Sequence, residues 1–140
     1  MSQVSQTSRT RHPLTRWAAI ILILALGASG VNDATHSMKS AVNLGQKAVI
    51  ACQFGYTVFG LIGTWALLTG SRWARPALWI WAVLLALVGG LASVYWGDSG
   101  PVVGLVGGLA SGGIAALVVW LGLRGMEKTE RTEKTERTER

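Results

Sequence analysis

Four long apolar runs dominate this chain, at residues 17–31, 48–68, 77–96 and 101–123. The last three are each close to the roughly 20 helical residues that cross the hydrocarbon core of a bilayer, and none contains a charged side chain. In lipid, backbone polar groups must be satisfied within a helix or a closed barrel, and these runs lack the alternation of strands. The sequence therefore predicts an all-α membrane protein with four transmembrane helices.

The segments around the runs divide the chain into three parts. Residues 1–13 are a basic, polar lead that we expect to be disordered, and residues 14–125 form the transmembrane domain. Residues 126–140 are a charged low-complexity tail with no apolar face, expected to be at most a frayed continuation of the fourth helix. Short turns predict an up-down bundle of antiparallel neighbours, with the longest loop at residues 32–43.

Local signals mark three helix ends. Asn43, followed three residues later by Gln46, resembles a capping box at the start of the second helix. Gly70 suits the position just past the end of that helix, and Pro101 suits the first turn of the fourth. These residues place the boundaries of the predicted second span and the start of the fourth.

The first run has two interpretations. Basic residues, a short apolar stretch and small residues near Gly30 also make up a secretory signal peptide. The apolar stretch continues through Val31, however, and the small residues match a cleavage site only loosely. We therefore expect a retained first helix, and cleavage would leave three spans in the same orientation.

The distribution of charge predicts the topology. In the tail, five Glu offset five Lys or Arg, so the net charge of +6 comes from residues that flank the spans and does not indicate nucleic-acid binding. With both termini in the cytoplasm, the outer side carries only Lys39 and Lys47. The inner side then carries Arg9, Arg11, Arg16, Arg72, Arg75 and Arg124. This imbalance follows the positive-inside rule. We expect a multi-pass protein of a bacterial cytoplasmic (inner) membrane with both termini cytoplasmic.

Tryptophans gather toward the predicted inner ends of the spans. They are Trp17, Trp65, Trp73, Trp79, Trp81 and Trp120. Indole rings prefer the level of the lipid headgroups. We expect all six to be interfacial anchors.

Small residues recur through the fourth run. They form one row at Gly100, Gly104, Gly108 and Gly112 and a second at Gly107, Ser111 and Ala115, with partial matches in the third run at Ala82, Ala86, Gly89, Gly90 and Ser93. Each helical glycine costs roughly 1 kcal/mol relative to alanine, so this many require a reason. Small residues at four-residue spacing let a neighbouring backbone approach closely. The pattern predicts a tight helix contact, either inside the monomer or between protomers.

The second run carries the one polar face of the four. Its residues are Gln46, Gln53, Thr57 and Thr64, at spacings that keep them on one side of a helix. A glutamine within hydrocarbon needs a hydrogen-bond partner, so Gln53 should face the interior of the bundle. The face predicts either hydrogen bonds between helices or a polar lining for a small-solute path.

Several classes of function require residues that this sequence lacks. No ionisable residue lies deep in a run, so an ion-coupled pump lacks its usual carrier. The single cysteine, Cys52, cannot form an internal disulfide, and Asp33 and His36 are too few for a structural zinc site. No nucleophile–base pair or phosphate-binding loop is present. We expect no catalytic residue, no metal and no cofactor.

The resulting functional hypothesis is a small integral membrane protein that is not an enzyme. We expect an accessory or scaffold component that associates through its glycine-rich fourth helix. Its partners would be the lipid bilayer and either further copies of the chain or a larger membrane complex. The alternative is a passive small-solute channel or transporter lined by the second helix.

Overall fold

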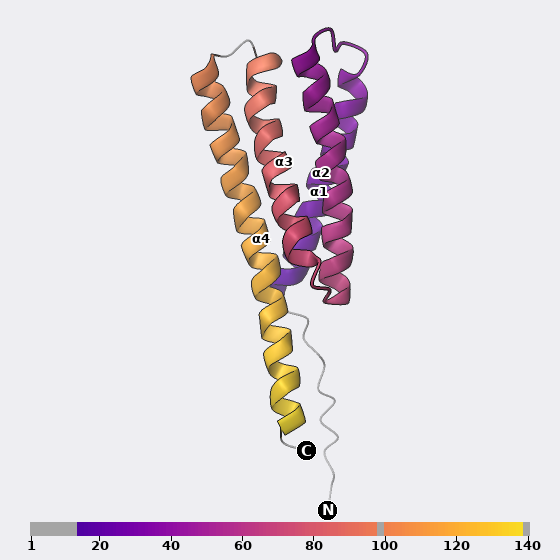
Figure 1. Ribbon diagram of the computed structural model, residues 1–140, viewed down its shortest axis with the longest axis vertical. Coiled ribbons are helices and arrows are strands. Elements are labelled where there is room, and N and C mark those ends of the chain that lie inside the picture. Colours follow the sequence, from indigo (N-terminus) through magenta and orange to yellow (C-terminus); the bar gives the residue numbers. More distant parts are fainter. Residues whose placement is uncertain (1–13, 98–99, 139–140) are drawn as a thin grey trace, which may run out of the picture.

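The computed structural model describes residues 14–97 and 100–138, with side chains described as far as residue 126. Four helices make up this part of the chain (Figure 1): α1 (Leu14–Ser37), α2 (Leu44–Thr69), α3 (Ala74–Tyr95) and α4 (Pro101–Thr138). Each is long and apolar enough to cross a membrane, α4 through its segment Pro101–Met126. The predicted all-helical fold with four candidate spans is confirmed, and it is compatible with a small multi-pass membrane protein. The expected lead at residues 1–13 lies outside the described residues.

The predicted ends of α2 are confirmed. The Asn43 side chain accepts a hydrogen bond from the Gln46 backbone N–H at 2.8 Å, and Gln46 Oε1 accepts one from the Asn43 N–H at 3.3 Å. This pair is a complete capping box, which satisfies two backbone donors at the helix start. Gly70 follows the helix in the left-handed region, with φ of 66°. Only glycine adopts that conformation without a steric penalty, so α2 stops at this residue.

The first helix is longer than the sequence predicted. Residues 32–37 belong to α1, so the expectation of a loop over all of residues 32–43 is wrong for its first half. Polar side chains in this segment bond to their own helix, because Thr35 Oγ1 donates to the Asn32 carbonyl at 2.8 Å and His36 Nδ1 lies 2.9 Å from the same oxygen. Ala34 is fully buried. Packing of Ala34 inside the bundle therefore extends a helix whose sequence has lost its apolar character.

The four helices form a ring in chain order. Each packs against its two neighbours in the ring, whereas α2 and α4 touch only slightly across it. We call the end with the α2–α3 turn the tail end, because α4 continues beyond it to Thr138 (Figure 1). We call the opposite end, with the α1–α2 and α3–α4 connections, the loop end.

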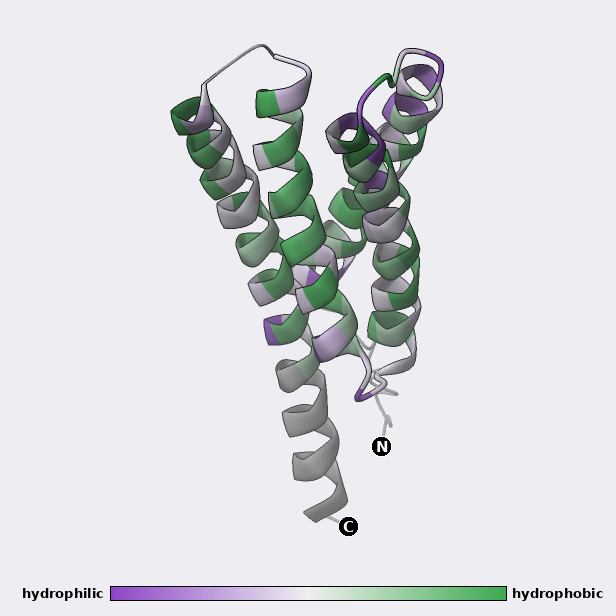
Figure 2. Ribbon diagram, turned by 45° about the horizontal axis from the view of Figure 1, so that its top comes forward, coloured by the Kyte–Doolittle hydropathy of each residue, from purple (hydrophilic) through white to green (hydrophobic). Residues whose placement is uncertain are grey.

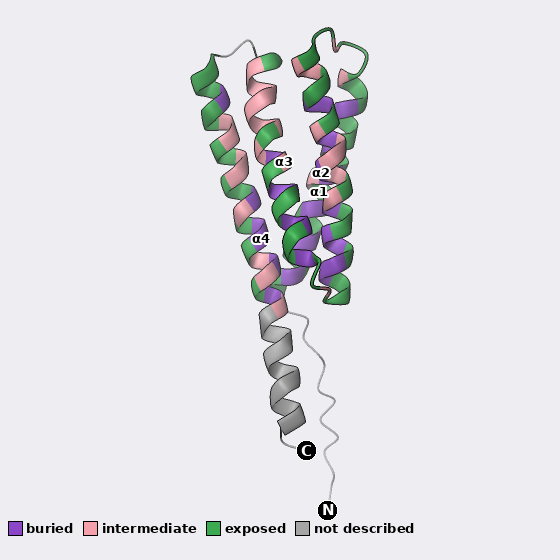
Figure 3. Ribbon diagram, in the orientation of Figure 1, coloured by how far each residue is buried: buried purple, intermediate pink, exposed green. Residues whose placement is uncertain are grey.

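The hydrophobic core lies mainly toward the tail end. Its fully buried members include Ile23 of α1, Leu67 of α2, Leu78 and Trp81 of α3 and Val119 of α4. Figure 3 shows the buried residues concentrated in this half of the molecule. Toward the loop end, α1 and α4 diverge (Figure 1). There α2 and α3 stay joined, because Gln46 Nε2 donates to the Tyr95 carbonyl at 3.3 Å. The bundle is therefore a closed ring at the tail end and open between α1 and α4 at the loop end.

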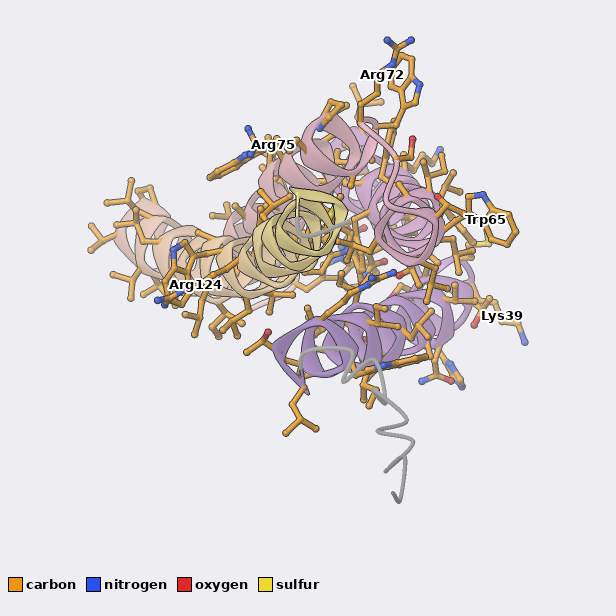
Figure 4. The ribbon with its side chains drawn as sticks, turned by 90° about the horizontal axis from the view of Figure 1, so that it is seen from below. Lys39, Trp65, Arg72, Arg75 and Arg124 are labelled. Atoms are coloured by element: carbon orange, nitrogen blue, oxygen red, sulfur yellow. The ribbon has the colours of Figure 1, made fainter. Side chains whose placement is uncertain are left out.

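Figure 2 shows hydrophobic residues along all four helices. Val58, Leu61, Val83 and Leu109 are each more than half exposed, as residues that face lipid would be. Seen from the tail end, Arg72, Arg75 and Arg124 extend outward from the bundle (Figure 4). The gathering of these cations at one end matches the charge pattern behind the predicted topology, and the cytoplasmic position of that end stays a prediction.

Candidate functional site

The glycine-rich face of α4 lies against α3 of the same chain. A Cβ atom added at Gly108 would lie 3.3 Å from the Ala86 carbonyl oxygen and 3.4 Å from Gly90 Cα. One added at Gly90 would lie 3.2 Å from the Gly104 carbonyl oxygen, and one added at Gly104 would lie 3.0 Å from that of Gly90. These neighbours are backbone atoms, which cannot rotate away. The two helices therefore approach as closely as their main chains allow.

Other members of the predicted packing set differ in their surroundings. A Cβ at Gly107 would lie 2.8 Å from the Gly89 carbonyl oxygen, and one at Gly112 would lie 3.1 Å from Ala86 Cβ. Ser111 Oγ donates within α4 to the Gly107 carbonyl at 2.9 Å. Gly100 has no atom within 4 Å of its added Cβ and stands apart from this contact.

Two further residues of α3 belong to the contact. A Cβ at Gly89 would collide with the Ser111 side chain, and Ser93 Oγ lies 2.7 Å from the position of a Cβ at Gly107. Ala82 is buried in the core below this region. The signal for Gly89 was present in the Gly89-Gly90 pair, because two adjacent helical glycines face different directions and either could meet a neighbour.

The four predicted lining residues of α2 do not gather into one site. Gln46 caps its own helix and donates from Nε2 to the Tyr95 carbonyl at 3.3 Å. The Thr57 hydroxyl lies 3.3 Å from the Gly27 carbonyl oxygen of α1 and 2.9 Å from the Gln53 carbonyl oxygen. Gln53 and Thr64 are buried, at 8% and 7% exposure. Two of the four therefore bond at the helix end or toward α1, and two are enclosed by the bundle.

Tyr56 joins α1 and α2 in a way that sequence reasoning missed. Its hydroxyl donates to the Leu26 carbonyl at 3.1 Å, and a Cβ at Gly30 would collide with the phenol. Gly30 is thus needed because the ring lies directly on the α1 backbone. The signal was the i+3 spacing from Gln53, which puts Tyr56 beside the polar face.

Arg16 is the largest departure from the sequence-based expectation. We expected it to flank the first span at the headgroups, but it is only 8% exposed, and its Nη2 donates to the Leu68 carbonyl at 2.7 Å. The α2 carbonyls near Leu68 carry the negative end of a helix dipole, and the last turn of α2 has no basic residue of its own. A Cβ at Gly125 would lie 3.0 Å from Arg16 Cβ, so this glycine makes room for the side chain. Spacing with Ile20 and Ile23 could have revealed that Arg16 shares the buried face of α1.

The tryptophans separate into two groups. Trp81 is fully buried in the core, so its expected role as an interfacial anchor is wrong. The small residue Gly60 on α2 accommodates its ring, with Trp81 Nε1 at 3.1 Å from the position of a Cβ there. The other six are exposed, as anchors would be: Trp17, Trp65, Trp73, Trp79, Trp96 and Trp120. Arg124 stacks on Trp120, with its guanidinium carbon 4.7 Å from the ring centroid.

Two surface cavities adjoin the α1–α2 pair. One, of about 240 Å³, is lined by apolar residues of both helices and by Thr57. The other, of about 330 Å³, lies near Lys47 and Phe54. Neither is lined by Gln53 or Thr64. Within the described residues no group of three or more His, Cys, Asp or Glu side chains could hold a metal ion.

No protein-family model, curated protein or solved structure matches this chain. Arguments about its function therefore start from the contacts within the molecule.

Proposed function

We propose that the protein is a non-catalytic accessory or scaffold component of a membrane complex, and that it associates through the outward face of α1. The sequence favoured the glycine-rich face of α4 for this role. That face packs against α3 at Gly104, Gly107 and Gly108, which leaves no room there for a second helix. The surface for a partner must therefore lie elsewhere on the bundle.

The outward face of α1 combines small and polar residues. Its small and polar members are Ala18, Ala25, Ser29, Asn32 and His36, all exposed, and the exposed Leu22 lies among them on the same face. Their spacing of seven, four, three and four residues keeps them on one side of the helix, away from the buried residues Ile23, Gly27 and Gly30. By contrast, the outward face of α3 between Trp79 and Leu87 is apolar. Small residues allow close approach and polar ones supply hydrogen bonds, which are the features of helix contacts in membranes.

The register between α1 and α2 sets the depth of this face. The Tyr56 hydroxyl donates a hydrogen bond to the Leu26 carbonyl, and the Thr57 hydroxyl donates one to the Gly27 carbonyl. Continuing this antiparallel register places Asn32 about level with Cys52. That level is four residues inside the apolar run that begins at residue 48, or about 6 Å. An amide at this depth is more stable with a protein partner than with lipid, and this observation carries the proposal.

A cysteine-crosslinking experiment in native membranes tests this function. In a Cys52→Ser background, Ser29→Cys should form adducts with another protein chain, whereas Val83→Cys on the apolar outer face of α3 should not. Adding Asn32→Leu should reduce the Ser29 adducts at unchanged expression, because the polar contact is removed. Equal crosslinking from both positions, or a yield of Ser29→Cys adducts that Asn32→Leu leaves unchanged, would contradict the proposal.

The alternative of a passive small-solute path has weaker support. Of the predicted lining residues, Gln53 and Thr64 are the two enclosed by the bundle. The apolar side chains of Ile23, Leu67 and Trp81 fill the core beside them. A scaffold role is more compatible with such packing than a continuous channel.

A further inference from the structure

Three buried polar atoms have no hydrogen-bond partner among the described residues. They are Gln53 Oε1, Thr64 Oγ1 and Trp81 Nε1. Their side chains are 8%, 7% and 0% exposed. An unpaired polar group is destabilising inside a protein, and more so where hydrocarbon surrounds the bundle. Partners for these atoms would therefore stabilise the fold considerably.

Gly60 lies at the centre of the arrangement. A Cβ there would lie 3.1 Å from Trp81 Nε1 and 3.1 Å from Ile23 Cγ2, so side chains from α3 and α1 converge on this residue of α2. Thr64 follows one turn later on the same face of α2, about 6 Å along the axis. Trp81 Nε1 and the buried Thr64 side chain therefore lie within about one helical turn of each other along α2. Gln53 lies about 10 Å from Gly60 in the opposite direction along this face.

The chemistry of the three groups favours a neutral ligand that both donates and accepts hydrogen bonds. An indole N–H only donates, an amide carbonyl only accepts, and a hydroxyl does both. None of the three is charged, so an ion would lose its hydration without gaining a countercharge. Water meets these requirements, and the entropy lost on immobilising one molecule is small beside the loss of its hydrogen bonds.

We propose that the bundle interior along the Gln53–Gly60–Thr64 face of α2 binds water. One molecule accepts a hydrogen bond from Trp81 Nε1 and donates one to Thr64 Oγ1. Another donates to Gln53 Oε1. Internal waters of this kind usually make about three hydrogen bonds to buried polar groups.

The divergence of α1 and α4 toward the loop end gives water a route to this site. Ala19, Leu26 and Asp33 lie seven residues apart on the side of α1 that meets α4, where Ala19 contacts the position of a Cβ at Gly122. Ala19 is fully buried, Leu26 is intermediate and Asp33 is exposed. The contact between α1 and α4 is thus lost progressively toward the loop end. Water that enters from the loop end would reach Gln53 before Gly60 and Thr64.

Nuclear magnetic resonance of the full chain in lipid nanodiscs tests the proposal. With ¹⁵N-tryptophan, the seven indole N–H groups give separate signals. Trp81→Phe identifies the Trp81 signal. If that variant fails to fold, Trp→Phe substitutions at the six other positions identify it by elimination. We expect a dipolar cross-peak between the Trp81 indole proton and water.

Two matched valine variants locate the water. Thr64→Val should abolish the Trp81–water cross-peak, because it removes the second partner. Thr57→Val should leave it intact, because Thr57 lies seven residues from Thr64 and its hydroxyl already bonds to the carbonyls of Gln53 and Gly27. A Trp81 indole with no water cross-peak and slow hydrogen–deuterium exchange would overturn the proposal. A cross-peak that survives Thr64→Val would overturn the bridging geometry.

Discussion

The two helix pairs of this bundle are held together in different ways. Between α3 and α4, glycines bring main chains into contact, with Gly108 against Gly90 and Ala86. Between α1 and α2, side-chain donors bridge to backbone carbonyls, from Tyr56 to Leu26 and from Arg16 to Leu68. Close backbone packing gains dispersion energy from many atoms but tolerates no added bulk, whereas each hydrogen bond acts locally. Substitutions should therefore have larger effects in the α3–α4 pair than in the α1–α2 pair.

The largest expected effect is that of Gly108→Leu. Its side chain would have to enter the space of the Ala86 carbonyl and the Gly90 backbone, which forces the two helices apart. We expect the free energy of unfolding to fall by about 3 kcal/mol, measured by denaturation in mixed micelles. Gly113→Leu is the matched control, because nothing lies within 4 Å of its added Cβ. Similar losses for both variants would mean that the contact with α3 does not determine the effect, because the change from glycine to leucine favours the helix equally at both positions.

Arg16→Met should have the next largest effect. It retains a long side chain but removes the bond to the Leu68 carbonyl, and hydrogen bonds of charged groups contribute about 1.5–3 kcal/mol. We expect a loss of about 2 kcal/mol in the same unfolding assay. Arg124→Met, at an exposed position stacked on Trp120, should cost only about 0.5 kcal/mol. An Arg16 variant as stable as the Arg124 variant would contradict the buried bridge.

Tyr56→Phe should have a smaller effect. It keeps the ring against Gly30 and removes only the hydroxyl that donates to Leu26. Hydrogen bonds between membrane helices contribute about 0.6 kcal/mol on average, and we expect a loss of that size. The comparison between helix pairs would fail if this variant were as unstable as Gly108→Leu.

The smallest effect is expected for Thr57→Val. The shape of the side chain is preserved, and the hydroxyl lies closer to its own helix, at 2.9 Å from the Gln53 carbonyl, than to Gly27 of α1 at 3.3 Å. We expect a change below about 0.5 kcal/mol in the unfolding assay. A loss above 1 kcal/mol would show that the Gly27 contact is the stronger one.

Features that depend on local chemistry could be predicted from the sequence. The apolar runs give the spans because transfer to lipid depends on composition, and the Asn43–Gln46 capping box and Gly70 define helix ends through residues close in the chain. The partner of the glycine-rich face could not be predicted. A row of small residues shows only that some backbone approaches, and the approach of α3 depends on the arrangement of the whole bundle.

The burial of residues near helix ends also could not be predicted from the sequence. Arg16 and Trp81 belong to residue types that favour the membrane interface, and both expectations rested on that average preference. Arg16 and Trp81 fit into the bundle because Gly125 and Gly60, respectively, have no side chain to occupy the same space. These glycines lie 109 and 21 residues away in the chain. The space that these glycines leave for Arg16 and Trp81 forms only when distant helices pack together in the folded chain.

The divergence of α1 and α4 toward the loop end gives the molecule a tapered outline (Figure 1). A tapered body displaces more lipid from the leaflet around its wide end than from the leaflet around its narrow end. Each inserted copy would therefore expand the two leaflets unequally. Many copies gathered in one patch would favour a membrane that bows outward on the side of the loop end.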